Sequence, residues 1–203
     1  MSCGFAFRSL VSVNCGKAAT GARMYGMINR AIEELVITAR GEKAWEAVKA
    51  SAGVEVDIFI SNDAYPDEMT VSLAAAATEH LGLSSPEFMR QFGIHWVVIT
   101  ATRDYEDLLL AGGTSLREFL CNLPNLHERV SLLLPHLDPP TFRCSDLAEH
   151  SLRLHYQSRR IGLTHFVEGL LLGLGIHFQI PVKVSLVAEK QAGADHDEFL
   201  IEW

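Results

Sequence analysis

The 203-residue sequence lacks any apolar run of the about 18 residues that a membrane span needs, and its longest, Leu170–Ile176, has the length of a buried helix. It also lacks an excess of basic residues. The formal charge of −8 argues against a general nucleic-acid binder, which needs a basic surface. The four cysteines form no CxxC pair, which excludes a disulfide framework or a cysteine zinc site and suits a reducing compartment. We therefore expect a soluble, cytoplasmic protein with no membrane and no nucleic acid among its partners.

Acidic residues are absent from residues 1–23, which hold Arg8, Lys17 and Arg23. The apolar stretch Leu10–Val13 is too short for a secretory signal. We expect this segment to be a disordered extension, or sequence upstream of the true start. The domain would then span residues 24–203.

Apolar residues recur at helical spacing from Met24 to about Leu134. The pattern predicts helices at residues 24–40, 44–52, 67–81, 85–100, 105–111, 115–122 and 125–134, the last opened by Pro124. After Pro140 the pattern predicts strands at 141–146, 151–159, 182–189 and 198–203, with a helix at 164–178. The fold class is therefore α+β, with a helical N-terminal lobe before a C-terminal lobe that contains a small antiparallel sheet.

Three polar side chains recur at every second position near the end of one predicted strand. Tyr156, Ser158 and Arg160 would share a face of an extended strand. Two hydroxyls and a guanidinium, with no acid among them, suit a carboxylate ligand. The alternative is an ordinary polar strand face.

One histidine lies on the apolar stripe of a predicted helix. Val130 and Leu134 follow His127 at positions i+3 and i+7. Histidine is a common axial ligand of haem iron, although a lone histidine on such a face is more often a core residue.

Taken together, these features resemble the H-NOX family, the haem nitric oxide/oxygen binding domains, of the bacterial stand-alone type related to the haem domain of soluble guanylate cyclase. The resemblance covers residues 24–203 and rests on Met24-Tyr25-Gly26, Asn125-Leu126-His127, Pro140 thirteen residues after the histidine, Tyr156-x-Ser158-x-Arg160, Leu163 to Gly175, and Asp195-His196-Asp197. It implies haem b (protoporphyrin IX iron) between the two lobes, with His127 as the metal ligand. It also implies that Tyr156, Ser158 and Arg160 hold the propionates, and that Pro140 presses on the porphyrin.

The resemblance also indicates which residues line the gas-binding side. Family members that bind oxygen stably carry a distal tyrosine, and the corresponding position is Phe166, which cannot donate a hydrogen bond. A one-residue shift would instead place Thr164 or His165 there. We also count Trp96 and Met24 among the cofactor-binding residues, with Tyr25, Met27 and His95 as further candidates. Alternatively, Trp96 is core packing and His95 is an exposed helix residue.

The implied function is a haem-based gas sensor for nitric oxide, which would also bind CO and exclude O₂. Release of the His127–iron bond would shift the lobes, and a separate signalling protein, such as a histidine kinase or a cyclic-di-GMP enzyme, would detect the change. We expect no enzymatic activity and no cyclase domain in the sequence. The alternatives are an O₂-binding sensor or carrier, a haem enzyme such as a peroxidase, and an adaptor that has lost haem.

Overall fold

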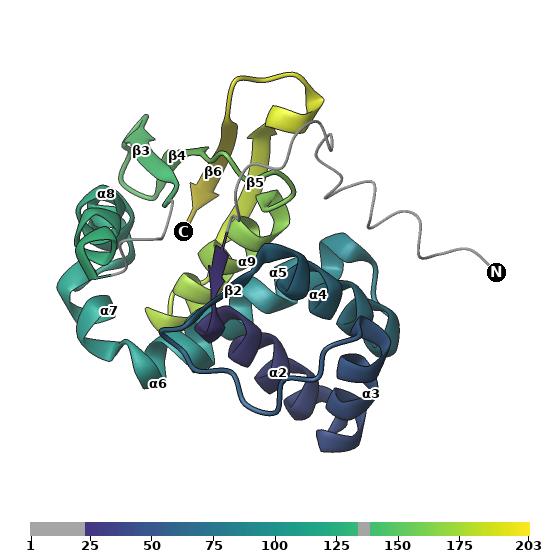
Figure 1. Cartoon of the computed structure of the whole chain (residues 1–203). Coiled ribbons are helices and arrows are strands. Elements are labelled where there is room, and N and C mark those ends of the chain that lie inside the picture. The colour runs from purple at the N-terminus through teal and green to yellow at the C-terminus, as the bar shows by residue number, and fades with distance from the viewer. Residues whose placement is uncertain (1–22, 134–138) are drawn as a thin grey trace. The chain divides into compact units, whose positions relative to one another are not determined.

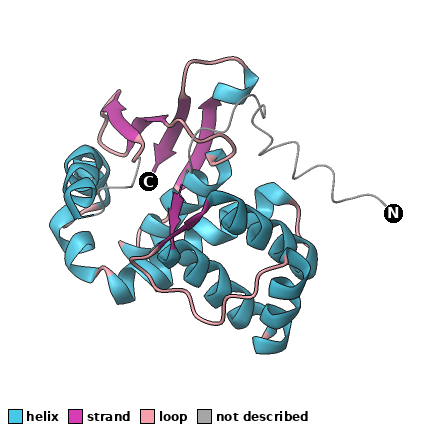
Figure 2. Ribbon diagram, in the orientation of Figure 1, coloured by secondary structure: helices cyan, strands magenta, loops and turns pink. Residues whose placement is uncertain are grey.

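Helices make up most of the residues that the structure describes, and the larger of the two sheets that these residues form is built from the C-terminal part of the chain (Figures 1 and 2). The computed structural model describes residues 23–133 and 139–203. The predicted extension lies outside the described residues except for Arg23. Contacts divide the chain into two units, Met1–Phe88 and Met89–Trp203. Within the described ranges, none of the helices combines the length and apolar character that crossing a membrane requires.

In its described part, residues 23–88, the first unit consists of helices and one short strand pair. Its elements are β1 (Arg23–Tyr25), α2 (Gly26–Arg40), α3 (Glu42–Ala52), β2 (Ala64–Pro66) and α4 (Asp67–Leu81). Ile32 of α2 and Trp45 of α3 are buried, as the periodicity predicts. Asp67 and Glu68 occupy the first turn of α4, where their negative charges interact favourably with the positive end of the helix dipole and stabilise the helix. A left-handed glycine, Gly82, ends α4.

The first helix begins two residues later than predicted, because Met24 is part of a strand. Met24 pairs with Tyr65 across the antiparallel β1–β2 ladder. The backbone N–H of Gly26 then donates to the carbonyl of Asp63 at 2.9 Å. A Cβ on Gly26 would lie 2.1 Å from the carbonyl oxygen of Ile60, so this turn into the helix requires glycine.

The second unit combines helices with a four-stranded antiparallel sheet. Helix α5 (Ser85–His95) crosses the boundary between the units. The elements that follow are the π-helix η1 (Trp96–Ala101), α6 (Thr102–Asp104), α7 (Glu106–Gly112), α8 (Leu116–Leu133), β3 (Thr141–Ser145), β4 (Ser151–Gln157), α9 (Thr164–His177), β5 (Lys183–Ala188), the 3₁₀ turn η2 (Lys190–Ala192) and β6 (Asp197–Glu202). The strand order is β3-β4-β6-β5, which confirms the predicted α+β class and the predicted hairpin of the last two strands.

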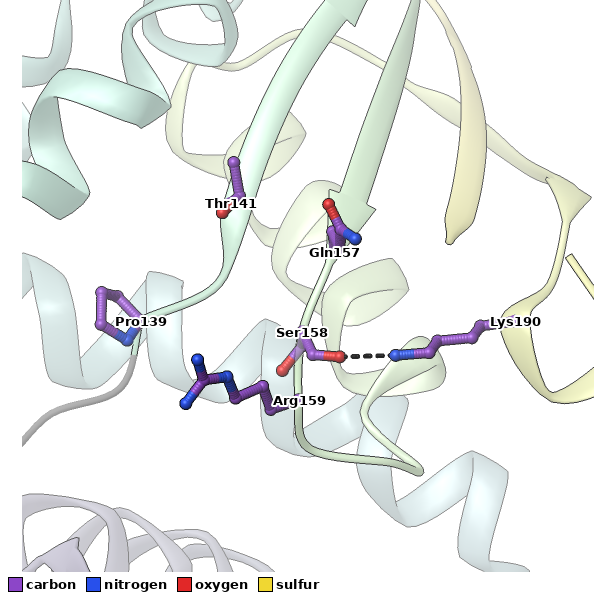
Figure 3. Close-up of a pocket in the computed structure, with 6 residues that line it drawn as sticks. All are labelled: Pro139, Thr141, Gln157, Ser158, Arg159 and Lys190. Atoms are coloured by element: carbon purple, nitrogen blue, oxygen red, sulfur yellow. Dashed lines mark hydrogen bonds between the residues drawn. The ribbon is translucent and has the colours of Figure 1, made fainter. Parts of the chain in front are cut away.

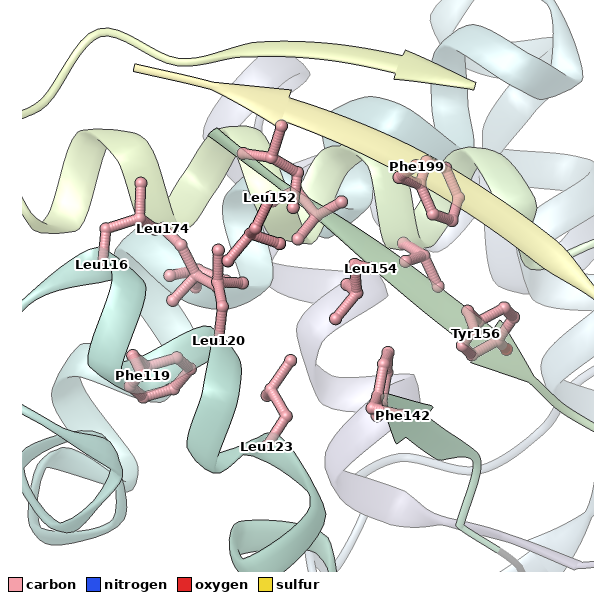
Figure 4. Packing of buried hydrophobic residues seen from close by; sticks show 14 of the residues in the cluster. Leu116, Phe119, Leu120, Leu123, Phe142, Leu152, Leu154, Tyr156, Leu174 and Phe199 are labelled. Atoms are coloured by element: carbon pink, nitrogen blue, oxygen red, sulfur yellow. The ribbon is translucent and has the colours of Figure 1, made fainter. Parts of the chain in front are cut away.

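One face of the sheet packs against helices to form the core of the second unit (Figure 4). Alternate residues of β4 and β6, including Leu154 and Phe199, point into this core. Leu120 and Leu123 of α8 pack in the same cluster. Helix α8 therefore belongs to the same hydrophobic core as the sheet.

The prediction of two helices around Pro124 is wrong, because α8 runs through the proline without a break. Pro124 has no N–H, so the carbonyl of Leu120 loses the partner that it would have in a regular helix. The thiol of Cys144 on β3 donates to that carbonyl oxygen at 3.4 Å instead. This contact satisfies the unpaired acceptor and connects α8 to the sheet.

Helices α5 and α9 approach each other closely through glycines. A Cβ on Gly169 would lie 2.1 Å from the carbonyl oxygen of Arg90, and a Cβ on Gly93 would lie 2.3 Å from that of Phe166. The salt bridge between Arg90 and Glu168 spans the same pair of helices at 3.0 Å. These contacts fix the position of α9 against α5.

Candidate functional site

His127 lies near the middle of α8 and is held by one hydrogen bond. Its Nδ1 lies 2.9 Å from the carbonyl oxygen of Leu123, one turn earlier. A carbonyl can only accept, so Nδ1 carries the hydrogen and the neutral ring has its lone pair on Nε2. Nε2 makes no hydrogen bond to any residue that the structure describes. The helix thus presents an oriented imidazole nitrogen that can act as a metal ligand.

Apolar surroundings keep this imidazole neutral. Burial lowers the pKa of His127, although the hydrogen bond to Leu123 acts in the opposite direction. The ring of Phe142, on β3, lies 4.9 Å from the His127 ring, and the ring of Tyr156 lies 5.4 Å from that of Phe142. A row of three rings therefore leads from α8 to the end of β4.

The prediction that Tyr156, Ser158 and Arg160 share one strand face is wrong, because β4 ends at Gln157. The hydroxyl oxygen of Ser158 accepts from the backbone N–H of Arg160 at 3.1 Å, and this local bond bends the chain out of the strand.

The three side chains nevertheless remain neighbours. Burial raises the pKa of the Tyr156 phenol, while a hydrogen bond with Ser158 and the positive charge of Arg160 lower it. The bend thus produces the same grouping that the strand pattern predicted, by a different geometry.

A pocket of about 310 Å³ opens beside Ser158 (Figure 3). Its lining consists of Pro139, Thr141, Gln157, Ser158, Arg159 and Lys190. The ammonium group of Lys190 donates to the backbone carbonyl of Ser158 at 2.8 Å, as the dashed line in Figure 3 marks. The lining carries two positive charges and no acidic side chain, so it favours an anionic group.

Sequence reasoning missed the role of Asp197 beside this group. Asp197 pairs with Tyr156 across the β4–β6 ladder and is buried. One carboxylate oxygen accepts from the hydroxyl of Thr164 at 2.7 Å, and the other accepts from the backbone N–H of Lys190 at 2.7 Å. Asp197 therefore joins β6, α9 and η2, and its negative charge is balanced by donors. Only the alternation of β6, which points Asp197 into the core, could have indicated this role.

Two of the predicted cofactor residues lie at the edges of the described structure. Pro140 directly precedes β3 and is half-buried. Met24 is half-buried in β1 and belongs to the first unit, whereas the other predicted site residues belong to the second.

The candidate distal residues lie on α5, η1 and α9. The ring of Phe166, in the first turn of α9, lies 5.1 Å from the ring of Phe92. Trp96 begins the π-helix and stacks on Tyr105 at 6.2 Å. Trp96 is partly buried and also packs against the core of the second unit.

The two candidate distal histidines have different environments. His95 is buried, with 7% of its surface exposed, so its interpretation as an exposed helix residue is wrong. His165 lies 3.1 Å from a carboxylate oxygen of Glu168, which also pairs with Arg90. His165 therefore contacts the same carboxylate that Arg90 of α5 pairs with.

A model of the haem-NO-binding family matches residues 25–186. The chain belongs to this family. The family is described as haem-NO-binding, and H-NOX domains are haem-based gas-sensor domains of the soluble guanylate cyclase type. Among curated relatives, soluble guanylate cyclase gcy-31 of Caenorhabditis elegans is 30% identical over 165 residues, or 81% of this chain and 24% of the relative. Soluble guanylate cyclase gcy-37 of the same organism is 27% identical over 172 residues, or 83% of this chain and 24% of the relative. The H-NOX chain thus spans about a quarter of the length of these relatives.

Solved H-NOX structures share the fold. An H-NOX protein from S. oneidensis, crystallised in the Fe(II)NO ligation state, superposes with a TM-score of 0.78 at 22% identity, covering 88% of this chain and 98% of that one. The Fe(II) unliganded H-NOX protein from K. algicida gives a TM-score of 0.74 at 22% identity, covering 88% and 96%. The match extends over nearly all of both structures, so the α+β arrangement of this chain is that of an H-NOX domain.

Proposed function

We propose that this H-NOX domain is a haem-based sensor of nitric oxide in which His127 holds the iron. One observation carries the proposal: the Nδ1–H of His127 is held by the carbonyl of Leu123, which leaves the Nε2 lone pair free to bind a metal. Haem b, when bound, would supply an iron atom that His127 would hold and that could bind a diatomic gas. Histidine ligands of metals typically donate their second ring N–H in this way.

The residues around His127 fit such a ligand. Burial favours its neutral form, which is the form that binds metal. Phe142 lies beside the ring and excludes water from it. The chain therefore supplies an oriented, neutral and desolvated imidazole.

We further propose that Tyr156, Ser158 and Arg160 bind the propionates. The hydroxyls of Tyr156 and Ser158 share a hydrogen bond, the positive charge of Arg160 acts on the Tyr156 phenol, and the adjacent pocket adds the positive charges of Arg159 and Lys190. Charge-assisted hydrogen bonds of this type are the strongest that proteins offer to carboxylates. We assign Pro140 the role of pressing on the porphyrin, since it leads into the strand that carries Phe142.

The choice of gas follows from the candidate distal residues. Phe166 packs against Phe92 and offers no hydrogen-bond donor. O₂ depends on such a donor more than NO or CO does. We therefore propose that the domain binds NO and CO and excludes O₂, with Trp96 and Met24 as further residues of the haem pocket.

The signal would start at α8. Loss of the attachment of His127 to the iron would free α8, whose other attachments in this region include the contact between Leu120 and Cys144. A helix that can take two positions, as we propose for α8, converts the change in one bond into a change in the surface that a partner protein contacts. We propose a cytoplasmic readout by a separate protein, a histidine kinase or a cyclic-di-GMP enzyme.

Absorption spectra of the ferrous full chain under argon, NO, CO and air test this function. We expect distinct NO and CO spectra, and in air oxidation without an oxy spectrum. A stable oxy spectrum would instead establish the O₂-binding alternative. Peroxidase activity of the ferric protein well above that of free haemin would establish the enzyme alternative.

A further inference from the structure

A second cluster of metal-ligating side chains lies on the sheet face opposite the core. His155 is on β4 and pairs in register with Glu198 on β6, while His196 directly precedes β6. Buried and partly exposed residues alternate along β4 and β6, and His155 and Glu198 are at partly exposed positions. The side chains of His155 and Glu198 therefore point away from the core. The side chains of His155, Glu198 and His196 are only 14%, 17% and 22% exposed.

The candidate ligand atoms of this cluster converge. Nδ1 of His155 lies 2.8 Å from Nε2 of His196 and 3.9 Å from a carboxylate oxygen of Glu198, and the three ligand atoms lie within 4.8 Å of one another. Two ligands at about 2.1 Å from a tetrahedral zinc ion lie about 3.4 Å apart. Small side-chain rotations would therefore bring all three atoms to coordinating distance.

The other polar atoms of these residues are already held by neighbours. Nε2 of His155 lies 2.7 Å from the hydroxyl oxygen of Ser145, and Nδ1 of His196 lies 2.5 Å from a carboxylate oxygen of Asp195. The second oxygen of Glu198 pairs with Arg153. Metal-binding histidines characteristically donate their second N–H to an oxygen, which fixes the tautomer and the ring orientation.

The protonation pattern of the metal-free cluster agrees with this arrangement. The His196 ring donates from Nδ1 to the Asp195 carboxylate, so its Nε2 accepts the Nδ1–H of His155. When a metal ion binds Nδ1 of His155, that nitrogen gives up its proton and one proton is taken up at Nε2, so the ring stays neutral in its other tautomer and its Nε2–H donates to the hydroxyl oxygen of Ser145. No backbone movement is needed for this change.

We propose that His155, His196 and Glu198 form a binding site for a divalent transition-metal ion of the Zn²⁺ class, separate from the haem iron. Two imidazoles and one carboxylate are the ligand set of zinc sites that keep a fourth position open to water. A bound ion would join β4 to the connection between β5 and β6.

Calorimetric titration of Zn²⁺ into the full chain as purified, without an affinity tag and after treatment with a chelator, tests the proposal. We expect one saturable site in the native chain and its loss in His196→Asn. The matched control is His150→Gln, which removes a histidine that is 71% exposed and lies outside the cluster. We expect the control to bind like the native chain.

Asp195→Asn separates a built site from an incidental one. This substitution keeps all three ligands and weakens only the carboxylate that orients His196, so we expect affinity to fall about tenfold or more. Circular dichroism and the haem absorption spectrum verify that each variant folds. Absence of a saturable site in the native chain, or equal binding by the native chain and His196→Asn, would overturn the proposal.

Discussion

Replacement of His127 by glycine separates the loss of a ligand from the loss of fold. The substitution removes one hydrogen bond, to Leu123, which contributes about 1 kcal/mol. Glycine inside a helix costs about 1 kcal/mol more relative to alanine. Lost packing of the ring against Phe142 adds about 1–2 kcal/mol, and the sum of about 3–4 kcal/mol still lies below the 5–15 kcal/mol by which domains are typically stable. We therefore expect His127→Gly to fold and to lose most of its haem.

Glu128→Gly is the matched control, since it places glycine at the next position of α8, where the side chain is exposed. Haem content per chain and the ferrous absorption spectrum are measured for both variants, with and without imidazole in the medium. We expect full haem in the control, and imidazole to restore haem in His127→Gly. Normal haem content in His127→Gly without imidazole would refute the assignment of His127.

Three further changes test the propionate site, the titration of His127 and the helix packing. Arg160→Ala should speed haem transfer to apomyoglobin, since loss of a buried propionate partner costs roughly 2–5 kcal/mol. Arg159→Ala, at an exposed position, should have a smaller effect on the transfer rate. Equal transfer rates in the two variants would contradict the assignment of Arg160. Burial lowers the pKa of His127, so the unfolded chain binds its proton more readily. The free energy of unfolding of the haem-free chain should therefore be fully developed above about pH 6.5 and fall as pH drops below it. Denaturant titrations should show a shallower fall in His127→Gln, and an unchanged slope would contradict this explanation. Gly169→Ala should lower the free energy of unfolding by about 1–3 kcal/mol, because its Cβ would meet the carbonyl of Arg90; unchanged denaturant stability would refute the close packing.

Much of the fold could be predicted where one residue pattern determines one element. Asp67–Leu81 is a helix with the predicted bounds, because its apolar spacing, its acidic first turn and Gly82 all agree. The predicted helix 85–100 continues without a break to Asp104, and its segment Trp96–Ala101 is a π-helix, which no periodicity signals. Pro124 was misinterpreted because the thiol that compensates for it lies on a strand distant in sequence.

The candidate site, like the fold, could be predicted from the sequence only in part. The pattern around Tyr156 picked out three side chains, but alternation could not reveal that the strand ends before Ser158, whose hydroxyl oxygen accepts from the backbone N–H of Arg160. The burial of His95 and the two donors on Asp197 depend on tertiary packing. Sequence spacing indicates which residues meet, and tertiary hydrogen bonds determine how they meet.

The iron–histidine stretching band in the resonance Raman spectrum of the ferrous protein tests the central claim most directly. We expect the band in the native chain, its disappearance on addition of NO, and a shifted band in His127→Gly supplied with imidazole. Absence of the band from the native ferrous protein, or a band in His127→Gly identical to the native one, would contradict the account of His127 as the ligand whose release starts the signal.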